Sequence, residues 1–366
     1  MARKLRIDAP LFAATLLLLT ISLAWVYSAS VLQAELKFGD PSHFLVRQTL
    51  WVVLGISCLM ITMRLDYRIY RHPTLLYGAI GLTTVALVAV YFCPPINGQH
   101  RWLGIGGLGV QPSEFAKIVA IVFVASTLQQ HLEEHYPLRA ALLRVGTVAG
   151  VFAALIFPEK DAGSALTLAA IAAVMTFVAG LAYKWALGAL FVAPWLVYAL
   201  ITLEPYRQRR LAAYWDPWAF RANEGFQVVQ SLIAVGSGGV WGKGFMQGVQ
   251  KMFYLPEAHN DFIYAVIAEE MGLVGTTLVL ICFGVIAWRG LRAARRAPDA
   301  YGALLATGIT VLLVAQALVN ISVVVGLVPA KGIALPFVSA GGSSMAVSLA
   351  AMGILLNISQ HASATT

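Results

Sequence analysis

Long apolar segments recur along the chain, separated by shorter polar stretches. Each segment is near the length that a helix needs to cross a hydrocarbon core of about 30 Å. The pattern therefore predicts an all-α polytopic membrane protein with about ten transmembrane helices. The apolar segments lie at residues 11–30, 48–64, 73–93, 113–130, 143–158, 164–182, 184–203, 262–288, 302–326 and 343–359.

The composition supports the same fold class. The 366 residues are 59% hydrophobic and 11% charged, with a mean hydropathy of +0.77, whereas a soluble domain is about 25% charged. The net charge of +8 is explained by cations on cytoplasmic loops that face anionic lipid. No nucleic-acid-reading motif is present, so we expect no nucleic-acid partner. Cys58, Cys93 and Cys282 are too far apart along the chain to suggest a disulfide framework or a metal cluster.

The distribution of cations orients the predicted helices. Cytoplasmic loops of membrane proteins are enriched in Lys and Arg, and the loops that join even-numbered to odd-numbered spans are the richer ones here. Both termini are then predicted to be cytoplasmic, the N-terminus with Arg3, Lys4 and Arg6. The cations of the predicted cytoplasmic loops are Arg64, Arg68, Arg71, Arg139, Arg144, Lys184, Arg289, Arg292, Arg295 and Arg296.

Three segments on the opposite, external side are not ordinary connectors. Residues 94–112 are rich in glycine, and residues of about 204–260, between the seventh and eighth spans, form one large extracytoplasmic loop of a single transmembrane domain, residues 1–366. Residues 328–344 are apolar yet interrupted by proline and glycine. Irregular backbone at membrane depth is tolerated only where protein or a water-filled cavity covers it. Ser343 or Ser344 is expected to cap the last helix. We therefore expect the functional site on this side.

A polar stretch runs directly into the eighth span and contains Glu257, His259, Asn260 and Asp261. A carboxylate placed where water gives way to hydrocarbon is costly to keep charged, and such residues are functional-site candidates. Asp261 is the first candidate for a catalytic group. Its alternative role is that of the N-cap of the eighth helix, and the two roles are compatible.

Glu269 and Glu270 lie further along the same segment. On one continuous helix, Glu269 would be about 12 Å deeper than Asp261, and too far away to act on the same atom. Glu270 would point to the opposite face. We therefore expect both glutamates to make contacts between helices or in the cytoplasmic half of the membrane.

Further charged residues occur near the external ends of spans. Glu114 and Lys117 are three residues apart and share a helix face, so they form either a structural ion pair or part of a site. Asp161 either caps the sixth span or points into an external cavity. Arg207, Arg209 and Arg210 suit phosphate or pyrophosphate, or anionic headgroups, at about 1 kcal/mol per cation. No zinc-ligand spacing and no phosphate-binding glycine motif is found in the sequence.

These motifs, in this order, resemble the SEDS family (shape, elongation, division and sporulation) of integral-membrane peptidoglycan glycosyltransferases. The resemblance runs almost end to end, and it is closer to the division or sporulation branch than to the rod-elongation branch. Departures from the family pattern are Lys160, Asn260 and Ala340. The resemblance is carried by Tyr27-Ser28-Ala29-Ser30, Asn97-Gly98, Arg101-Trp102, Gln111-Pro112-Ser113-Glu114, Lys117, Asp161, Gly163, Tyr206-Arg207, Arg210, Gln230-Ser231, Leu255-Pro256-Glu257, Asp261-Phe262, Glu269-Glu270, Gly272, Leu335-Pro336-Phe337, Ser339 and Gly341-Gly342-Ser343-Ser344.

The resemblance implies polymerisation of lipid II into β-1,4-linked glycan strands at the outer face of the bacterial cytoplasmic membrane, for septal wall synthesis in cell division. It implies Asp261 as the general base, with Glu114 orienting Lys117. The residues implied to bind substrate and pyrophosphate are Arg101, Glu114, Lys117, Arg207, Arg210, Lys331 and Ser343. The residues implied to support them are Trp102, Gln111, Asp161, Glu257 and His259.

The same resemblance implies partners. These are a class B penicillin-binding protein with transpeptidase activity and other membrane proteins of the division or elongation machinery. No cofactor is required by the sequence, and a divalent cation (Mg or Mn) between Asp261 and pyrophosphate fits the chemistry without being demanded. Two alternatives are a lipid II flippase and a non-catalytic scaffold of the division complex. Clustering of the polar motifs on one face, without an inverted repeat, favours the enzyme over the transporter.

Overall fold

The computed structural model describes residues 7–95, 99–105, 108–159, 161–181 and 205–364, together with isolated positions between 183 and 202. Its elements are mostly long helices. In chain order they are α1 (Ala9–Phe38), α2 (His43–Arg64), η1 (Tyr67–Arg71), α3 (Pro73–Ala89), η2 (Val90–Phe92), β1 (Leu103–Ile105), β2 (Leu108–Val110), α4 (Pro112–Glu134), α5 (Leu138–Ile156), η3 (Phe157–Glu159), α6 (Ala162–Val178), α8 (Pro205–Trp215), α9 (Phe226–Gly238), α10 (Ile263–Arg296), α11 (Ala300–Val324) and α12 (Ser343–Ala364).

The predicted fold class is confirmed, and the chain is a helical polytopic membrane protein. Among the described residues, eight helices are long and apolar enough to cross a membrane, and α6 is a shorter apolar helix. They coincide with nine of the ten predicted apolar segments. The segment predicted at 184–203 falls almost entirely outside the described residues, so the total of about ten spans stays a prediction.

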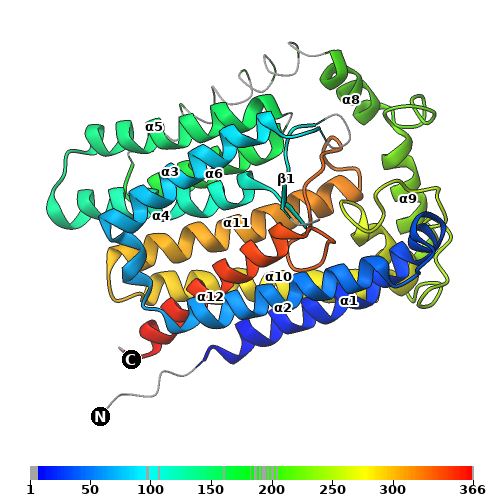
Figure 1. The fold of residues 1–366 in the computed structure, drawn as a ribbon, viewed down its shortest axis with the longest axis horizontal. Coiled ribbons are helices and arrows are strands. Elements are labelled where there is room, and N and C mark those ends of the chain that lie inside the picture. Colours follow the sequence, from blue (N-terminus) through cyan, green and yellow to red (C-terminus); the bar gives the residue numbers. More distant parts are fainter. Residues whose placement is uncertain are drawn as a thin grey trace.

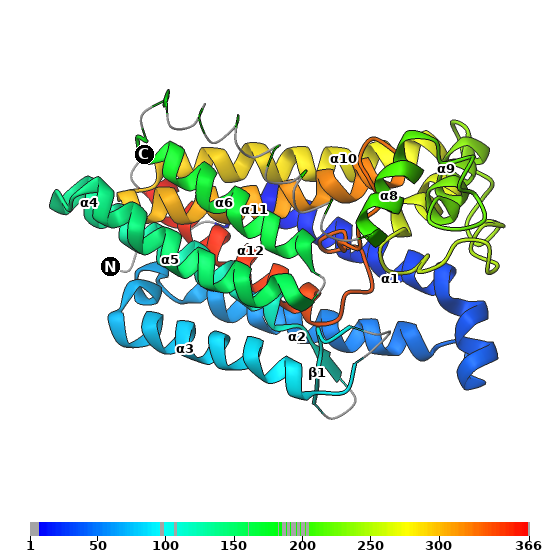
Figure 2. The same cartoon turned by 90° about the horizontal axis from the view of Figure 1, so that it is seen from above.

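The spanning helices form one elongated bundle with α12 inside it (Figure 1). Within its most apolar stretch, 83% of α12 is buried, against 22% of α3 and of α5. The exposed side chains of α3 include Leu75, Tyr77, Leu82 and Val85. A helix that is apolar on all sides suits the interior of a bundle. Figure 2 shows α3 along one edge of the bundle. We infer that α12 is the central packing element and that the exposed apolar side chains of α3 and α5 face lipid.

The start of α1 and the end of α12 lie at the same end of the bundle (Figure 1). Asp8 joins them: it caps α1 by accepting from the Leu11 N–H at 3.3 Å, and it also accepts from the Ser359 hydroxyl at 2.9 Å. Arg289 at the far end of α10 donates to the same carboxylate at 2.6 Å. Placing both ends together agrees with the predicted topology, while their cytoplasmic location stays a prediction.

Helix α10 is broken near its start. Gly272 has a φ of +64° and a ψ of −154°, and a Cβ atom there would lie 2.4 Å from the Gly242 nitrogen. The Tyr264 hydroxyl donates to the Thr276 carbonyl at 3.3 Å, although twelve helical residues span about 18 Å. Residues 263–271 therefore form a separate arm that turns sharply into the long part of α10.

Glu269 and Glu270 lie in this arm, on the N-terminal side of the break. Glu269 accepts from the Lys243 ammonium at 2.7 Å and from the Val249 N–H at 2.9 Å, which is a contact with another part of the chain, as expected. Its depth in the membrane stays a prediction. Glu270 accepts from Lys251 at 2.6 Å and from Ser28 of α1 at 2.7 Å, which confirms a contact between elements. Both glutamates bind residues 243–251, so they anchor the segment that leads to Asp261.

The opposite end of the bundle holds all three segments that the sequence singled out (Figure 1). Residues 94–112 contain a short antiparallel hairpin in which Leu103 pairs with Val110, a detail that the sequence did not predict. Residues 205–262 carry α8 and α9. The segment between α11 and α12 is irregular, with positive φ angles at Gly326, Phe337 and Gly342. The predicted convergence of these segments is therefore confirmed.

Candidate active site

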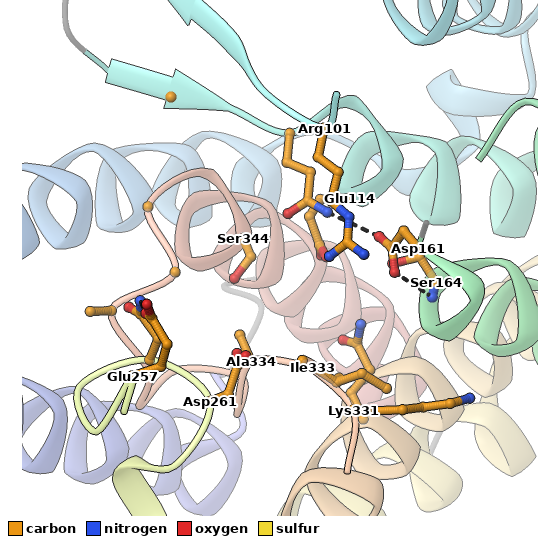
Figure 3. A pocket seen from close by; sticks show the side chains of 18 of the residues that line it. Arg101, Glu114, Asp161, Ser164, Glu257, Asp261, Lys331, Ile333, Ala334 and Ser344 are labelled. Carbon is orange, nitrogen blue, oxygen red and sulfur yellow. Dashed lines mark hydrogen bonds between the residues drawn. The ribbon is translucent and has the colours of Figure 1, made fainter. Parts of the chain in front are cut away.

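A cavity of about 950 Å³ lies where these segments meet (Figure 3). Its wall is built from α2, the segment around the β-hairpin, α4, α6, α8, residues 257–262 and residues 330–344. Since these segments are spread along the chain from α2 to the start of α12, the cavity depends on the packing of the whole bundle. Most of the predicted site residues line it.

Asp261 stands at the entrance to α10 but does not cap it. The N-cap position is Phe262, and it has no side-chain capping bond. The main-chain carbonyl of Asp261 accepts from Asn320 at 2.7 Å. Among the described residues no hydrogen bond or ion pair to its carboxylate is found. The carboxylate is therefore held by its backbone and is available to a substrate in the cavity.

The electrostatic environment of Asp261 suits a base that works near neutral pH. Burial raises the pKa of Asp261 to about 7, and the negative charge of Glu257 adds to the rise. Arg101 and Arg210 act in the opposite direction, and Asp161 raises the pKa slightly further. A general base is most effective when its pKa is near the working pH.

Glu114 and Lys117 form the predicted pair in the first turns of α4. Pro112 occupies the helix start, where its missing N–H costs nothing. The Lys117 ammonium donates to Glu114 at 2.8 Å, and its side chain is only 1% exposed. Both residues line the cavity. The pair is confirmed, and its position on the cavity wall makes it part of the candidate site.

Asp161 fulfils both of the roles that the sequence left open. One oxygen, Oδ1, caps α6 by accepting from the Ser164 N–H at 3.1 Å. The other, Oδ2, accepts from the Gln111 amide at 3.1 Å and from the Ser113 hydroxyl at 3.4 Å. Asp161 and Gln111 also line the cavity. The aspartate therefore ties α6 to the start of α4.

Four further predicted cations reach the cavity. Arg101 donates to the Glu159 carbonyl at 3.0 Å, and Arg210 to the Ala330 carbonyl at 3.1 Å. The Arg207 guanidinium lies over the Phe157 ring, 4.6 Å from its centroid. Burial lowers the pKa of Lys331, against the influence of Asp161. Together with Lys117, five cationic side chains from four parts of the chain face one space.

The predicted supporting residues Trp102, Glu257 and His259 also line the cavity. The Trp102 ring packs over Gly109 of the hairpin. Glu257 has a φ of +54° and accepts from the Asn260 amide at 2.6 Å. His259 is buried beside the Phe44 ring at 4.8 Å, and burial lowers its pKa. These residues shape the walls on either side of the base.

Ser343 is not among the residues that line the cavity. It is buried, and its hydroxyl accepts from the Gln111 N–H at 3.0 Å. The neighbouring Ser344 lines the cavity. Both serines lie in the first turn of α12, where adjacent residues point in directions about 100° apart. The sequence alone could not decide between them. The role of Ser343 in binding stays a prediction.

Two lining residues that the sequence analysis did not select are Gln316 and Gly332. Gln316 and Asn320 are polar residues four apart in the apolar segment 302–326, on one face of α11. Polar residues inside a span often mark function, so this spacing was a usable signal. Gly332 had no such signal, because its role depends on the Asp261 carboxylate packing against it.

No group of three His, Cys, Asp or Glu side chains able to hold a metal ion occurs within the described ranges. The cavity carboxylates Glu114 and Asp161 come from different segments, and Glu257 and Asp261 share a third. A divalent cation between Asp261 and pyrophosphate fits the chemistry and stays a prediction.

Comparison with known proteins defines the class. The family profile FTSW_RODA_SPOVE, described as "cell cycle protein", matches residues 9–364. The chain therefore belongs to this family, the SEDS family that its motifs resemble. It is 40% identical over 364 residues to a probable peptidoglycan glycosyltransferase FtsW of Geobacter metallireducens, covering 98% of this chain and 96% of the relative. It is also 40% identical to stage V sporulation protein E of Bacillus subtilis, over 97% of both chains.

Solved structures share the fold. A chain from a peptidoglycan synthase complex, in a study of how polymerisation and crosslinking are coordinated, superposes with a TM-score of 0.79 at 25% identity, covering 98% of this chain and 99% of that one. The rod shape determining protein RodA of Thermus thermophilus superposes with a TM-score of 0.71 at 24% identity, over 97% of both chains. The latter similarity bears on the fold alone.

Proposed function

We propose that this protein is a peptidoglycan glycosyltransferase that polymerises lipid II at the outer face of the bacterial cytoplasmic membrane. The proposal rests on the presence of several cationic side chains and a carboxylate, unpaired within the described ranges, in the same cavity. Asp261, whose carboxylate has no partner among the described residues, shares the cavity with Arg101 and Lys331 (Figure 3). Lys117 also lines this cavity. A base and a set of cations are the two elements that transfer of a sugar from a pyrophosphate requires.

In the proposed reaction the deprotonated Asp261 takes the proton of the acceptor sugar's 4-hydroxyl. The acceptor oxygen attacks the anomeric carbon of the donor as the bond to the pyrophosphate oxygen breaks. The electron pair leaves with undecaprenyl pyrophosphate. Because the donor is α-linked and the product β-linked, the displacement inverts the anomeric centre and needs no covalent intermediate.

The cations stabilise the charge that develops on the leaving group. The cavity is lined by six cationic side chains and four carboxylates, so it has a surplus of positive charge that suits a pyrophosphate. The cations are Arg47, Arg101, Lys117, Arg207, Arg210 and Lys331, and the carboxylates are Glu114, Asp161, Glu257 and Asp261. Charged groups placed in advance around a developing anion are a large source of catalysis. The Glu114 carboxylate orients the Lys117 ammonium.

We further propose a cellular setting. The relatives at 40% identity are named FtsW and stage V sporulation protein E, which supports septal wall synthesis in division or sporulation. The similar chain from a peptidoglycan synthase complex supports a class B penicillin-binding protein as the transpeptidase partner. Other membrane proteins of the division machinery would assemble with this pair.

The test is polymerisation by the purified protein in liposomes, with labelled lipid II and with and without its cognate transpeptidase. The expected products are glycan strands and undecaprenyl pyrophosphate in matching amounts. Movement of lipid II between leaflets without either product would replace the proposal with the flippase. Absence of both activities from folded protein in the presence of the partner would favour the scaffold.

A further inference from the structure

Asn320 connects the two segments that carry opposite charges into the cavity. It lies in the last part of α11 and is 1% exposed. Its Nδ2 atom donates to the Asp261 carbonyl at 2.7 Å and to the Ile333 carbonyl at 2.7 Å. A side-chain amide has two N–H bonds, and both are used here.

The two carbonyls belong to distant parts of the chain. Asp261 ends the large loop segment, whereas Ile333 follows Lys331 and Gly332 in the irregular segment between α11 and α12. The Asp261 carboxylate lies directly against Gly332. Asn320 therefore determines how far the base lies from the Lys331 segment.

The hydrogen bond from Asn320 is a main constraint on the position of Asp261. Among the described residues no side-chain partner of the Asp261 carboxylate is found, so the main chain alone aims it into the cavity. The Oδ1 atom of Asn320 is buried without a hydrogen-bond partner, which costs about 1–3 kcal/mol.

We propose that Asn320 is a positioning residue for glycosyl transfer, which holds the backbone of Asp261 against the Lys331–Ile333 segment so that base and cations act on one substrate. This inference rests on the proposed function, since it assigns Asn320 a role through Asp261. Asn320 acts through the backbone and does not line the cavity, so it is expected to affect turnover more than substrate binding.

Asn357 provides a matched control. It is also a buried asparagine, 2% exposed, and its Nδ2 donates to the Met63 carbonyl at 2.9 Å while its Oδ1 accepts from the Tyr67 N–H at 3.0 Å. It lies in the second half of α12 and is not among the residues that line the cavity. Asn357→Leu removes comparable hydrogen bonds without touching the base.

The experiment compares Asn320→Leu with Asn357→Leu in the full-length protein in liposomes. For Asn320→Leu we expect kcat for lipid II polymerisation to fall about 100-fold, with KM within about twofold, because a displacement of about 1 Å costs that much. Should Asn320→Leu not purify as folded protein, Asn320→Ser keeps one donor and is expected to show a smaller loss of the same kind.

A second readout needs no turnover. Carbodiimide modifies protonated carboxyls, so the pH dependence of labelling at Asp261, followed by mass spectrometry without substrate, reports its protonation. In the unaltered protein the midpoint is expected near the pKa of about 7. The charged groups that act on Asp261 are Glu257, Arg101, Asp161 and Arg210, and none of them changes in these variants. In Asn320→Leu the midpoint is expected to fall, because a released segment admits water.

The two readouts separate this inference from the proposed function. A lower kcat and a shifted labelling midpoint in Asn320→Leu, both absent from Asn357→Leu, would support the positioning role. The same kcat and midpoint in the two variants would overturn it, even if polymerisation itself is confirmed. Failure of the unaltered protein to polymerise would reject the proposed function and with it the role in glycosyl transfer, whereas a labelling midpoint shifted only in Asn320→Leu would still support the contact that holds Asp261.

Discussion

The Asp261 carboxylate lies against the backbone of Gly332, so closely that a Cβ atom on residue 332 would approach Oδ2 to 2.7 Å. Real Cβ atoms essentially never come that near another heavy atom, so a side chain here has to displace the carboxylate. Glycine at this position is a condition for the placement of the proposed base.

Gly332→Ala is therefore expected to lower polymerisation by about 100-fold through displacement of Asp261, while the protein still folds, because the φ of Gly332 is not in the positive region that favours glycine. The assay is initial rate from lipid II in liposomes. Gly104→Ala is the control, since a Cβ there meets nothing within 4 Å. Equal rates in the two variants would show that the contact with Gly332 is unimportant.

Asp261→Asn is expected to abolish glycan formation while the protein inserts and purifies normally. An amide has almost the same shape as the carboxylate but cannot take a proton at neutral pH. Polymer from purified lipid II, resolved by gel electrophoresis, is the measurement. Near-normal polymer would sink the assignment of Asp261 as the base. Normal cell division with this variant would support the scaffold alternative.

The pH profile follows from the same residue. The pKa of Asp261 is raised to about 7, first by burial and then by Glu257, and the base acts when deprotonated. The rate is therefore expected to rise with pH through about 7 and to level off above it. Glu257→Gln removes one cause of the rise, so its profile is expected to shift to lower pH. A pH profile unchanged by Glu257→Gln would show that Glu257 does not raise the pKa of Asp261.

The raised pKa also has a consequence for stability, because the folded protein holds the Asp261 proton more tightly than the unfolded chain does. Between about pH 4 and 7 Asp261 binds more protons in the folded protein than in the unfolded chain. Its contribution to the free energy of unfolding therefore falls as pH rises through that window. Asp261→Asn is thus expected to raise the unfolding temperature at pH 8 and to have little effect near pH 4. Equal shifts at both pH values would contradict the linkage.

Lys117→Met, combined with Glu114→Gln to avoid an unpaired carboxylate, is expected to reduce polymerisation by about 100-fold to 1,000-fold, in the range found for loss of one electrostatic donor. Arg139→Met is the control, because Arg139 is exposed at the start of α5, at the other end of the bundle. The rate with lipid II is measured at saturating substrate. Comparable losses in both would indicate that Lys117 is only a structural charge.

Lys251→Met is expected to destabilise the protein by about 3–5 kcal/mol, because it leaves the buried Glu270 carboxylate without its ion-pair partner. Adding Glu270→Gln is expected to restore part of that loss. Arg209→Met is the matched control, since Arg209 is 64% exposed in its pair with Glu224 and is expected to cost about 0–1 kcal/mol. The free energy of unfolding in detergent is measured for all three variants. An unchanged free energy of unfolding in Lys251→Met would show that the Lys251–Glu270 ion pair does not anchor this segment.

Much of the fold could be predicted from the sequence, because span length and polarity are local properties. Each apolar segment within the described residues overlaps its helix, although α1 and α10 extend well beyond the predicted ends at 30 and 288, and the Glu114–Lys117 pair followed from helical spacing. The N-cap role of Asp161 was equally local. The branch-specific role, the number of spans, the domain organisation and the roles of the site residues stay predictions.

The sequence by itself determined that this chain crosses a membrane repeatedly and brings irregular, charged segments to one side, since burial of apolar residues in lipid is dictated by composition along the chain. Only the tertiary structure decided which residues meet. The arm before Gly272 lies where Glu269 meets residues 243–251, the packing of the first turn of α12 puts Ser344 and not Ser343 on the cavity, and Asn320 joins Asp261 to Ile333. These contacts connect segments far apart in sequence, and backbone turns and side-chain packing set their geometry, which local hydrophobicity does not encode.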